Sequence, residues 1–150
     1  MKIVFVCTDN IGRSVIAEYC LKDYLAKNNN SGIEVSSAGT DADSDLTGFS
    51  FAHFDELKKI GIDASGHQRR QITEEIVDDS DLIIAMAQVH EKELKEMFGI
   101  DVPLYNEIIK NEKSSIICSS PGHKDLDANM RRLVHYFADS MEQFMKNIKG

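Results

Sequence analysis

A cysteine and an arginine early in the chain have the spacing of a phosphate-binding motif. Cys7 and Arg13 enclose a loop of five residues, Thr8, Asp9, Asn10, Ile11 and Gly12. A cysteine thiolate is a nucleophile, and a guanidinium binds two phosphate oxygens at once. We therefore predict that the five loop residues surround a phosphoryl group, that Cys7 attacks its phosphorus, and that Arg13 holds its oxygens.

The elements on either side of this loop favour the same chemistry. Residues 3–7 are continuously apolar, which is typical of a buried parallel strand, and residues 13–27 carry apolar side chains at helical spacing. A loop that joins a strand to a helix N-terminus presents unpaired amides and the positive end of the helix dipole to an anion. The same features favour the thiolate form of Cys7, and the Ser14 hydroxyl can donate a hydrogen bond to its sulfur.

The alternative is that Cys7 is a buried strand residue and Arg13 a solvated helix residue. Free cysteine is commonly found in protein cores, and the five-residue spacing alone is weak evidence. The buried strand before the loop, Ser14 directly after Arg13 and the amphipathic helix together favour the catalytic interpretation.

The remaining pattern predicts an α/β protein. Strands are expected at residues 34–37 and 81–86, with a weaker one at 102–105, and helices at residues 49–60, 89–98 and 126–148. Strands that alternate with helices predict a three-layer domain, in which helices cover both faces of a short parallel sheet of about four strands. The loop of residues 7–13 then lies at the carboxyl edge of the sheet, where ligands bind in such folds.

The composition is that of one acidic domain over residues 1–150. The chain is 42% hydrophobic, which is enough for an ordinary core. Its net charge of −8 makes a nucleic acid an unexpected partner. The apolar run of residues 3–6 is too short for a signal peptide, and no later run could span a bilayer, so we expect a cytoplasmic protein without a membrane partner.

The three cysteines, Cys7, Cys20 and Cys118, form no close pair. An odd number of widely spaced cysteines argues against a disulfide framework and against a zinc site. The glycine-rich nucleotide motifs are also missing from the sequence. We therefore expect no metal and no cofactor, and we expect Cys20 and Cys118 to be core residues.

Four blocks of the sequence together resemble a known family of enzymes. The blocks are VFVCTDNIGRSVIAE (residues 4–18), SSAGT (36–40), GIDASGHQRRQIT (61–73) and DLIIAM (81–86). In this order they are similar to the low-molecular-weight protein tyrosine phosphatases. The resemblance implies that Asn10, Ser14, Ser37 and His67 form a hydrogen-bond network that supports the loop. It also implies that Ile11 lies in the loop wall and favours an aryl phosphate.

Two loop positions depart from the family pattern. Asp9 stands where the family usually has a small glycine or alanine, and its carboxylate should oppose phosphate unless it points outward. Aspartate also tolerates unusual backbone angles. Gly12 replaces the common second loop cysteine, so Cys7 has no partner in the loop for a protective disulfide.

The position of the general acid departs as well. The family carries an aspartate before a proline ahead of the last helix, and Ser120 precedes Pro121 here. A serine hydroxyl does not serve as a proton donor near neutral pH. Asp125, Asp127 and His123 are nearby alternatives, although the two aspartates are also explained by stabilisation of the N-terminus of the last helix.

Two functions remain open from the sequence. The first is a cysteine-dependent phosphatase, a monomer or weak dimer, that hydrolyses phosphotyrosine in proteins or a small aryl phosphate through a phosphocysteine. The second is a catalytically impaired relative that binds phosphate or phosphotyrosine, which is motivated by Asp9 and Ser120. Arsenate reduction would need further cysteines after the third strand, and the sequence has none between Met86 and Asp101.

Overall fold

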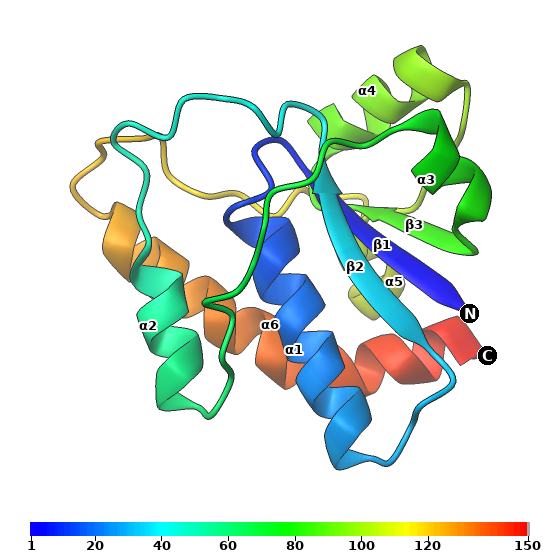
Figure 1. The fold of residues 1–150 in the computed structure, drawn as a ribbon, viewed down its shortest axis with the longest axis horizontal. Coiled ribbons are helices and arrows are strands. Elements are labelled where there is room, and N and C mark those ends of the chain that lie inside the picture. The colour runs from blue at the N-terminus through cyan, green and yellow to red at the C-terminus, as the bar shows by residue number, and fades with distance from the viewer. Residues whose placement is uncertain (150) are drawn as a thin grey trace.

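The computed structural model describes residues 1–149 and contains a parallel sheet with helices on both faces (Figure 1). Strand β1 (Lys2–Cys7) lies between β2 (Glu34–Gly39) and β3 (Leu82–Ala85), and it pairs in parallel with both. The predicted α/β class is confirmed. Where the sequence indicated a weak fourth strand at residues 102–105, the structure has a single parallel bridge between Leu104 and Ala85.

The predicted helices are present, with two additions. The structure has α1 (Arg13–Lys27), α2 (Ala52–Lys59), α4 (Gln88–Phe98) and α6 (Leu126–Lys149), and α2 begins three residues later than expected. The additions are α3 (Glu74–Asp79) and α5 (Tyr105–Lys110). The backbone N–H of Leu104 donates to the Glu107 carboxylate at 3.0 Å, which caps α5 and ends the extended segment at this point.

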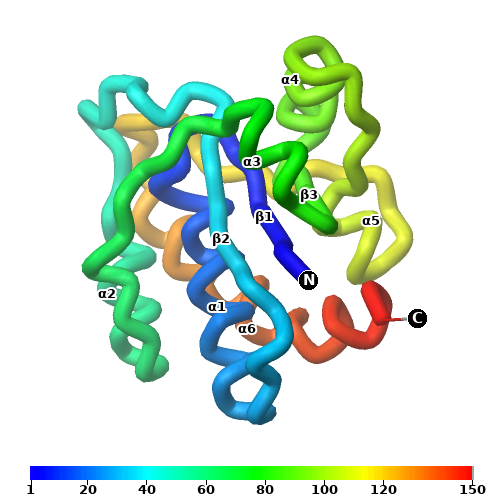
Figure 2. The backbone as a smooth tube through the Cα atoms, turned by 45° about the vertical axis from the view of Figure 1, so that its right-hand side comes forward, coloured from blue at the N-terminus to red at the C-terminus, as the bar shows by residue number. Residues whose placement is uncertain are grey.

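Side chains of β1 alternate between two hydrophobic clusters, one on each face of the sheet. Ile3 and Phe5 pack on the side of α1 and α6, where Phe137 and Phe144 are fully buried. Val4 and Val6 pack on the other side, with Leu94 of α4. Figure 2 shows α1 and α6 on one side of the sheet and α3 and α4 on the other. This alternation follows from the period of two in a strand.

Three segments meet at the carboxyl edge of the sheet. The loop after β1 leaves at Cys7, which pairs with Gly39 at the end of β2. The segment ahead of α6 reaches the same edge because the N–H of Ile116 donates to the carbonyl of Met86 at 2.9 Å. Gly39 is required here, since a Cβ atom at this position would lie 2.4 Å from the carbonyl oxygen of Thr8.

We found no helix within residues 1–149 whose length and apolar character would suit it to crossing a membrane.

Candidate active site

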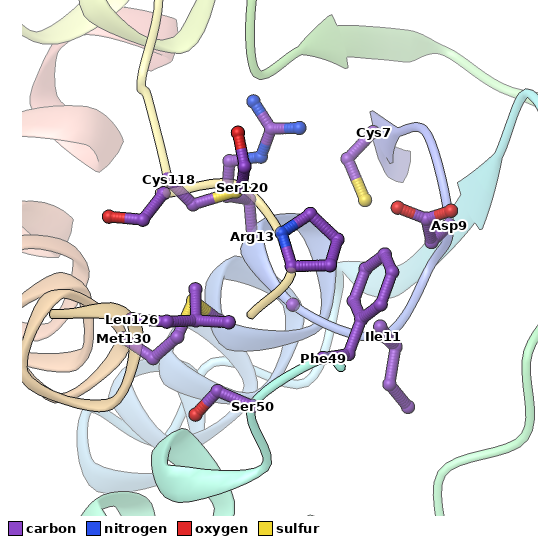
Figure 3. A pocket seen from close by; sticks show the side chains of 13 residues that line it. Cys7, Asp9, Ile11, Arg13, Phe49, Ser50, Cys118, Ser120, Leu126 and Met130 are labelled. Carbon is purple, nitrogen blue, oxygen red and sulfur yellow. The ribbon is translucent and has the colours of Figure 1, made fainter. Parts of the chain in front are cut away.

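A pocket of about 220 Å³ opens at the carboxyl edge of the sheet (Figure 3). Its floor comes from the loop after β1, and its walls come from the segments that precede α2 and α6. The lining residues are Cys7, Asp9, Ile11, Gly12, Arg13, Phe49, Ser50, Cys118, Ser119, Ser120, Pro121, Leu126 and Met130. The structure therefore brings together the predicted nucleophile, the predicted guanidinium and the position that should carry the general acid.

A chain of hydrogen bonds ends at the sulfur of Cys7. The Sγ atom of Cys7 lies 2.9 Å from Oγ of Ser14. Nδ2 of Asn10 donates to Oγ of Ser14 at 3.0 Å and to Oγ of Ser37 at 2.9 Å. Because Ser14 already accepts from an amide, its hydroxyl proton is available to Cys7. This places Asn10, Ser14 and Ser37 in the network that the resemblance implied.

Glu18 completes this chain, and the sequence analysis did not assign it a role. Oγ of Ser37 donates to Oε1 of Glu18 at 2.5 Å, and Lys22 contacts Oε2 at the same distance. Glu18 is only 5% exposed. Glu18 follows Ser14 by four residues on α1, so the two side chains share a helix face. That spacing was a usable signal for its position beside the loop.

Two histidines hold the loop from outside. Nε2 of His67 lies 3.1 Å from the carbonyl oxygen of Asn10, and Nε2 of His53 lies 2.6 Å from that of Ile11. A carbonyl oxygen only accepts, so both nitrogens carry the proton. Within a peptide plane the N–H points opposite to the C=O, so the amides of Ile11 and Gly12 point away from these histidines, and both residues line the pocket. His67 was predicted to support the loop, whereas His53 was not.

A third histidine, His90 on α4, contacts the loop through Thr8. The backbone N–H of Ala87 donates to Nδ1 of His90 at 3.1 Å, so Nε2 bears the proton that is shared with Oγ1 of Thr8 at 2.9 Å. Thr8 and Asn10, which were predicted to bind phosphate, are not among the residues that line the pocket, and the side chain of Asn10 contacts Ser14 and Ser37 instead. Sequence reasoning missed His90, because its partner lies 82 residues away.

Burial keeps His53 and His90 neutral near pH 7. It lowers the pKa of His53 to about 4 and that of His90 to about 3, and the charge of Arg13 adds to the effect on His90. Both side chains are fully buried. Each ring therefore acts as a fixed hydrogen-bond donor to the loop.

The guanidinium of Arg13 lies on the pocket wall. Its Nη1 atom donates to the carbonyl of Ile116 at 2.8 Å. This contact joins the start of α1 to the segment that precedes α6. The other guanidinium N–H groups remain available to an anion in the pocket, which fits the predicted clamp.

Asp9 lines the pocket. It does not point outward, so its charge stays in the site. Its Oδ1 atom accepts from Oγ of Ser44 at 2.5 Å, and Nη2 of Arg69 donates to the same Oγ at 2.6 Å. Nε of Arg69 donates to the Asp9 carbonyl at 2.9 Å. The residue of the loop with a positive φ is Asn10, at 53°, and not Asp9. Asparagine tolerates this left-handed conformation well.

Ser120 lines the pocket, and the three alternative proton donors do not. The Oδ1 atom of Asp127 accepts a hydrogen bond from Oγ of Ser50 at 2.5 Å. Ser50 lines the pocket, and Asp127 lies behind it. Asp125 and His123 are exposed, and Nδ1 of His123 accepts from the N–H of Asp125 at 3.1 Å. The position of the family acid is therefore inside the site but carries only a hydroxyl.

The other two cysteines differ in their surroundings. Cys20 is buried in the core as expected, and burial raises the pKa of its thiol to about 12. Cys118 is half-buried: it packs against the edge of the core, as expected, and it also lines the pocket, which was not expected.

The position of the missing second loop cysteine is next to Met130. A Cβ atom on Gly12 would lie 2.9 Å from the terminal methyl of Met130 on α6. The methionine side chain therefore occupies part of the space that a larger residue at position 12 would take. Within residues 1–149, no three histidine, cysteine or acidic side chains are grouped so that they could hold a metal ion.

Comparison with known proteins gives one family over almost the whole chain. The family described as low molecular weight phosphotyrosine protein phosphatase matches residues 2–149. The resemblance that was inferred from four sequence blocks is thereby confirmed.

Individual relatives differ in the substrates that their names give. The low molecular weight protein-tyrosine-phosphatase Ptp of Acinetobacter johnsonii is 34% identical over 96 residues, which cover 63% of this chain and 62% of that protein. A protein-arginine-phosphatase of Bacillus subtilis (strain 168) is 33% identical over 99 residues, covering 66% and 64%. In both cases less than two thirds of the relative is matched. The solved structure of a YwlE mutant from Bacillus subtilis is similar over 100% of this chain and 99% of that chain, with a TM-score of 0.83 and 25% identity.

Proposed function

The chain belongs to the low molecular weight phosphotyrosine protein phosphatase family, and on this premise we propose that it hydrolyses phosphotyrosine in proteins through a phosphocysteine on Cys7. The observation that carries this proposal is the position of the Cys7 sulfur. It lies in the floor of the pocket, 2.9 Å from the Ser14 hydroxyl, in a loop of which Asp9, Ile11 and Gly12 line the same pocket. These groups stabilise a thiolate and the oxygens of a bound phosphoryl group.

The reaction has two steps. In the first, the Cys7 thiolate forms a bond to phosphorus, the bond from phosphorus to the tyrosine oxygen breaks, and that oxygen takes up a proton. In the second, a water oxygen forms a bond to the phosphorus of the phosphocysteine and gives up a proton, the sulfur–phosphorus bond breaks to return the Cys7 thiolate, and inorganic phosphate leaves. Arg13 holds the phosphoryl oxygens in both steps, and Ser14 stabilises the thiolate that departs in the second.

The pocket walls support an aromatic substrate. Ile11, Phe49, Leu126 and Met130 line the pocket with apolar surface. A phenyl ring attached to the phosphoryl group would bury its faces against such side chains. This supports the preference for an aryl phosphate that Ile11 indicated in the sequence.

Phosphoarginine is a second candidate substrate, and Asp9 favours it. The carboxylate of Asp9 lines the same pocket, and it could pair with the guanidinium of a phosphorylated arginine. The similarity to a protein-arginine-phosphatase points in the same direction.

Two peptides of one sequence, phosphorylated on tyrosine or on arginine, test the substrate. Release of inorganic phosphate would be measured for the wild type and for Cys7→Ser. We expect faster release from the phosphotyrosine peptide, and we expect none from either peptide with Cys7→Ser. Faster release from the phosphoarginine peptide would establish the second substrate instead. Tight binding of the phosphotyrosine peptide without release would show an impaired binding protein and would overturn the proposed function.

A further inference from the structure

The proposed reaction needs a proton for the leaving oxygen, and the usual position of the donor holds a serine. Among the pocket-lining residues only Cys7, Asp9, Arg13 and Cys118 have side chains that ionise. Cys7 is the nucleophile, and a guanidinium does not release its proton near neutral pH. Asp9 is thus the one carboxyl group that lines the pocket directly.

Asp9 is held in a defined orientation by Ser44. The guanidinium of Arg69 donates to Oγ of Ser44 at 2.6 Å and to the carbonyl of Ser44 at 3.0 Å. Oγ of Ser44 must therefore direct its own proton to Oδ1 of Asp9, 2.5 Å away. The hydrogen bonds within residues 1–149 leave Oδ2 of Asp9 without a donor. One carboxylate oxygen is fixed, and the other is free to act in the pocket.

The Asp9 carboxylate is on the side of the reacting groups. In Figure 3 the Asp9 carboxylate points into the cavity on the side of Cys7, above Phe49 and Ile11. The nucleophile and the loop amides approach the phosphoryl group from the floor, so the leaving oxygen lies toward the walls. Asp9 belongs to the loop in the floor, and it lines the same pocket as these walls.

We propose that Asp9 is the catalytic residue that protonates the leaving oxygen, in place of an acid at position 120. This inference rests on the proposed function. A carboxylate and a phosphoryl dianion repel each other in the same pocket, and a shared proton relieves that repulsion. In the first step the proton moves from Oδ2 of Asp9 to the tyrosine oxygen as its bond to phosphorus breaks. In the second step the Asp9 carboxylate takes a proton from the attacking water, which restores the starting state.

The variant Asp9→Asn tests this role, because the amide keeps the size of the side chain and an oxygen for Ser44 but has no acidic proton. Two substrates would be compared through kcat/KM, which reports the first chemical step. The leaving group of 4-nitrophenyl phosphate is a stable anion, whereas that of phenyl phosphate needs a proton. We expect Asp9→Asn to lose about 10²- to 10⁴-fold on phenyl phosphate and less than about 10-fold on 4-nitrophenyl phosphate.

Asp127→Asn is the matched control, because its carboxylate contacts Ser50 but does not line the pocket. It should not reduce the phenyl phosphate rate selectively. Inhibition by inorganic phosphate should be as strong in Asp9→Asn as in the wild type or stronger, since a negative charge is removed. The role of Asp9 would be overturned if Asp9→Asn lost equal activity on the two substrates or bound inorganic phosphate much more weakly than the wild type. It would also be overturned if Asp127→Asn or Cys118→Ser, instead of Asp9→Asn, lost activity selectively on phenyl phosphate.

The proposed function and this inference fail in different ways. Suppose that Cys7→Ser loses turnover of 4-nitrophenyl phosphate, and that Asp9→Asn loses equal activity on phenyl phosphate and 4-nitrophenyl phosphate. These results would overturn only the inference. Turnover that is the same in Cys7→Ser and in the wild type would overturn both.

Discussion

The Sγ atom of Cys7 and the Oγ atom of Ser14 lie 2.9 Å apart in the floor of the pocket, and both side chains are buried. The first ends β1 and the second is the second residue of α1, so the contact joins the strand to the helix across the loop. Since Asn10 donates to Ser14, the hydroxyl proton of Ser14 is directed to the sulfur.

Ser14→Ala should slow the hydrolysis of the phosphocysteine. A hydrogen bond to a charged group contributes about 1.5–3 kcal/mol, so its loss should reduce this step by about 10- to 100-fold. A rapid-mixing experiment with 4-nitrophenyl phosphate would then show a burst of product followed by slow turnover. Ser140→Ala removes a hydroxyl that contacts Tyr105 away from the loop, and it should show no such burst. Unchanged turnover in Ser14→Ala would contradict the role of this hydroxyl.

Arg13→Lys should reduce kcat/KM by about 100-fold or more. An ammonium cannot reproduce the planar pair of N–H groups that binds two phosphoryl oxygens, and it would also lose the fixed contact with Ile116. The control is Arg131→Lys, because Arg131 pairs with Asp55 and Glu56 between α6 and α2. A wild-type kcat/KM in Arg13→Lys would remove Arg13 from the site.

The buried histidines should make the protein less stable in mild acid. The unfolded chain binds a proton at each histidine below pH 6.5, whereas the folded pKa is about 4 for His53 and about 3 for His90. The unfolded state therefore binds more protons between these values, and the free energy of unfolding falls as the pH falls. Each histidine should contribute about 1.4 kcal/mol per pH unit in this window.

Urea unfolding at pH 7 and at pH 5 measures this effect. Between pH 7 and pH 5 the free energy of unfolding should decrease in both proteins, and the decrease should be about 2 kcal/mol smaller in His90→Gln than in the wild type. His123 is exposed, so His123→Gln should leave the decrease unchanged. Equal decreases in the wild type and in His90→Gln would show that His90 is not held neutral in the folded state.

The local part of the site could be predicted from the sequence. The loop from Cys7 to Arg13 and the helix that follows it lie within one short segment, and α1 begins and ends where its apolar spacing indicated. The network partners Ser37 and His67 lie in other segments, and only the resemblance to a family connected them with the loop. Sequence spacing carries little information about such contacts, because they depend on how the sheet edges meet.

The remaining contacts come from segments that the chain brings together only when folded. His53 and His90 reach the loop from α2 and α4, and Arg69 and Ser44 hold Asp9 from two separate loops. A lone histidine in a helix pattern gives no sign of its partner. The charge on Asp9 was visible in the sequence, but the contact that directs the carboxylate was not. This is why the sequence indicated a weakened phosphate site, whereas the structure supports a proton donor.

If Cys7 carries the phosphoryl group during turnover, samples that are quenched in acid should contain a phosphocysteine. The Ser14→Ala variant would be mixed with an aryl phosphate, quenched within one turnover, digested and analysed by mass spectrometry. We predict a phosphoryl group on the peptide that contains Cys7, formed at the rate of the product burst, and no such adduct in Cys7→Ser. Catalysis through a phosphocysteine would be contradicted by turnover without an adduct on this peptide. It would also be contradicted by a Cys7→Ser variant that keeps more than about a tenth of wild-type kcat.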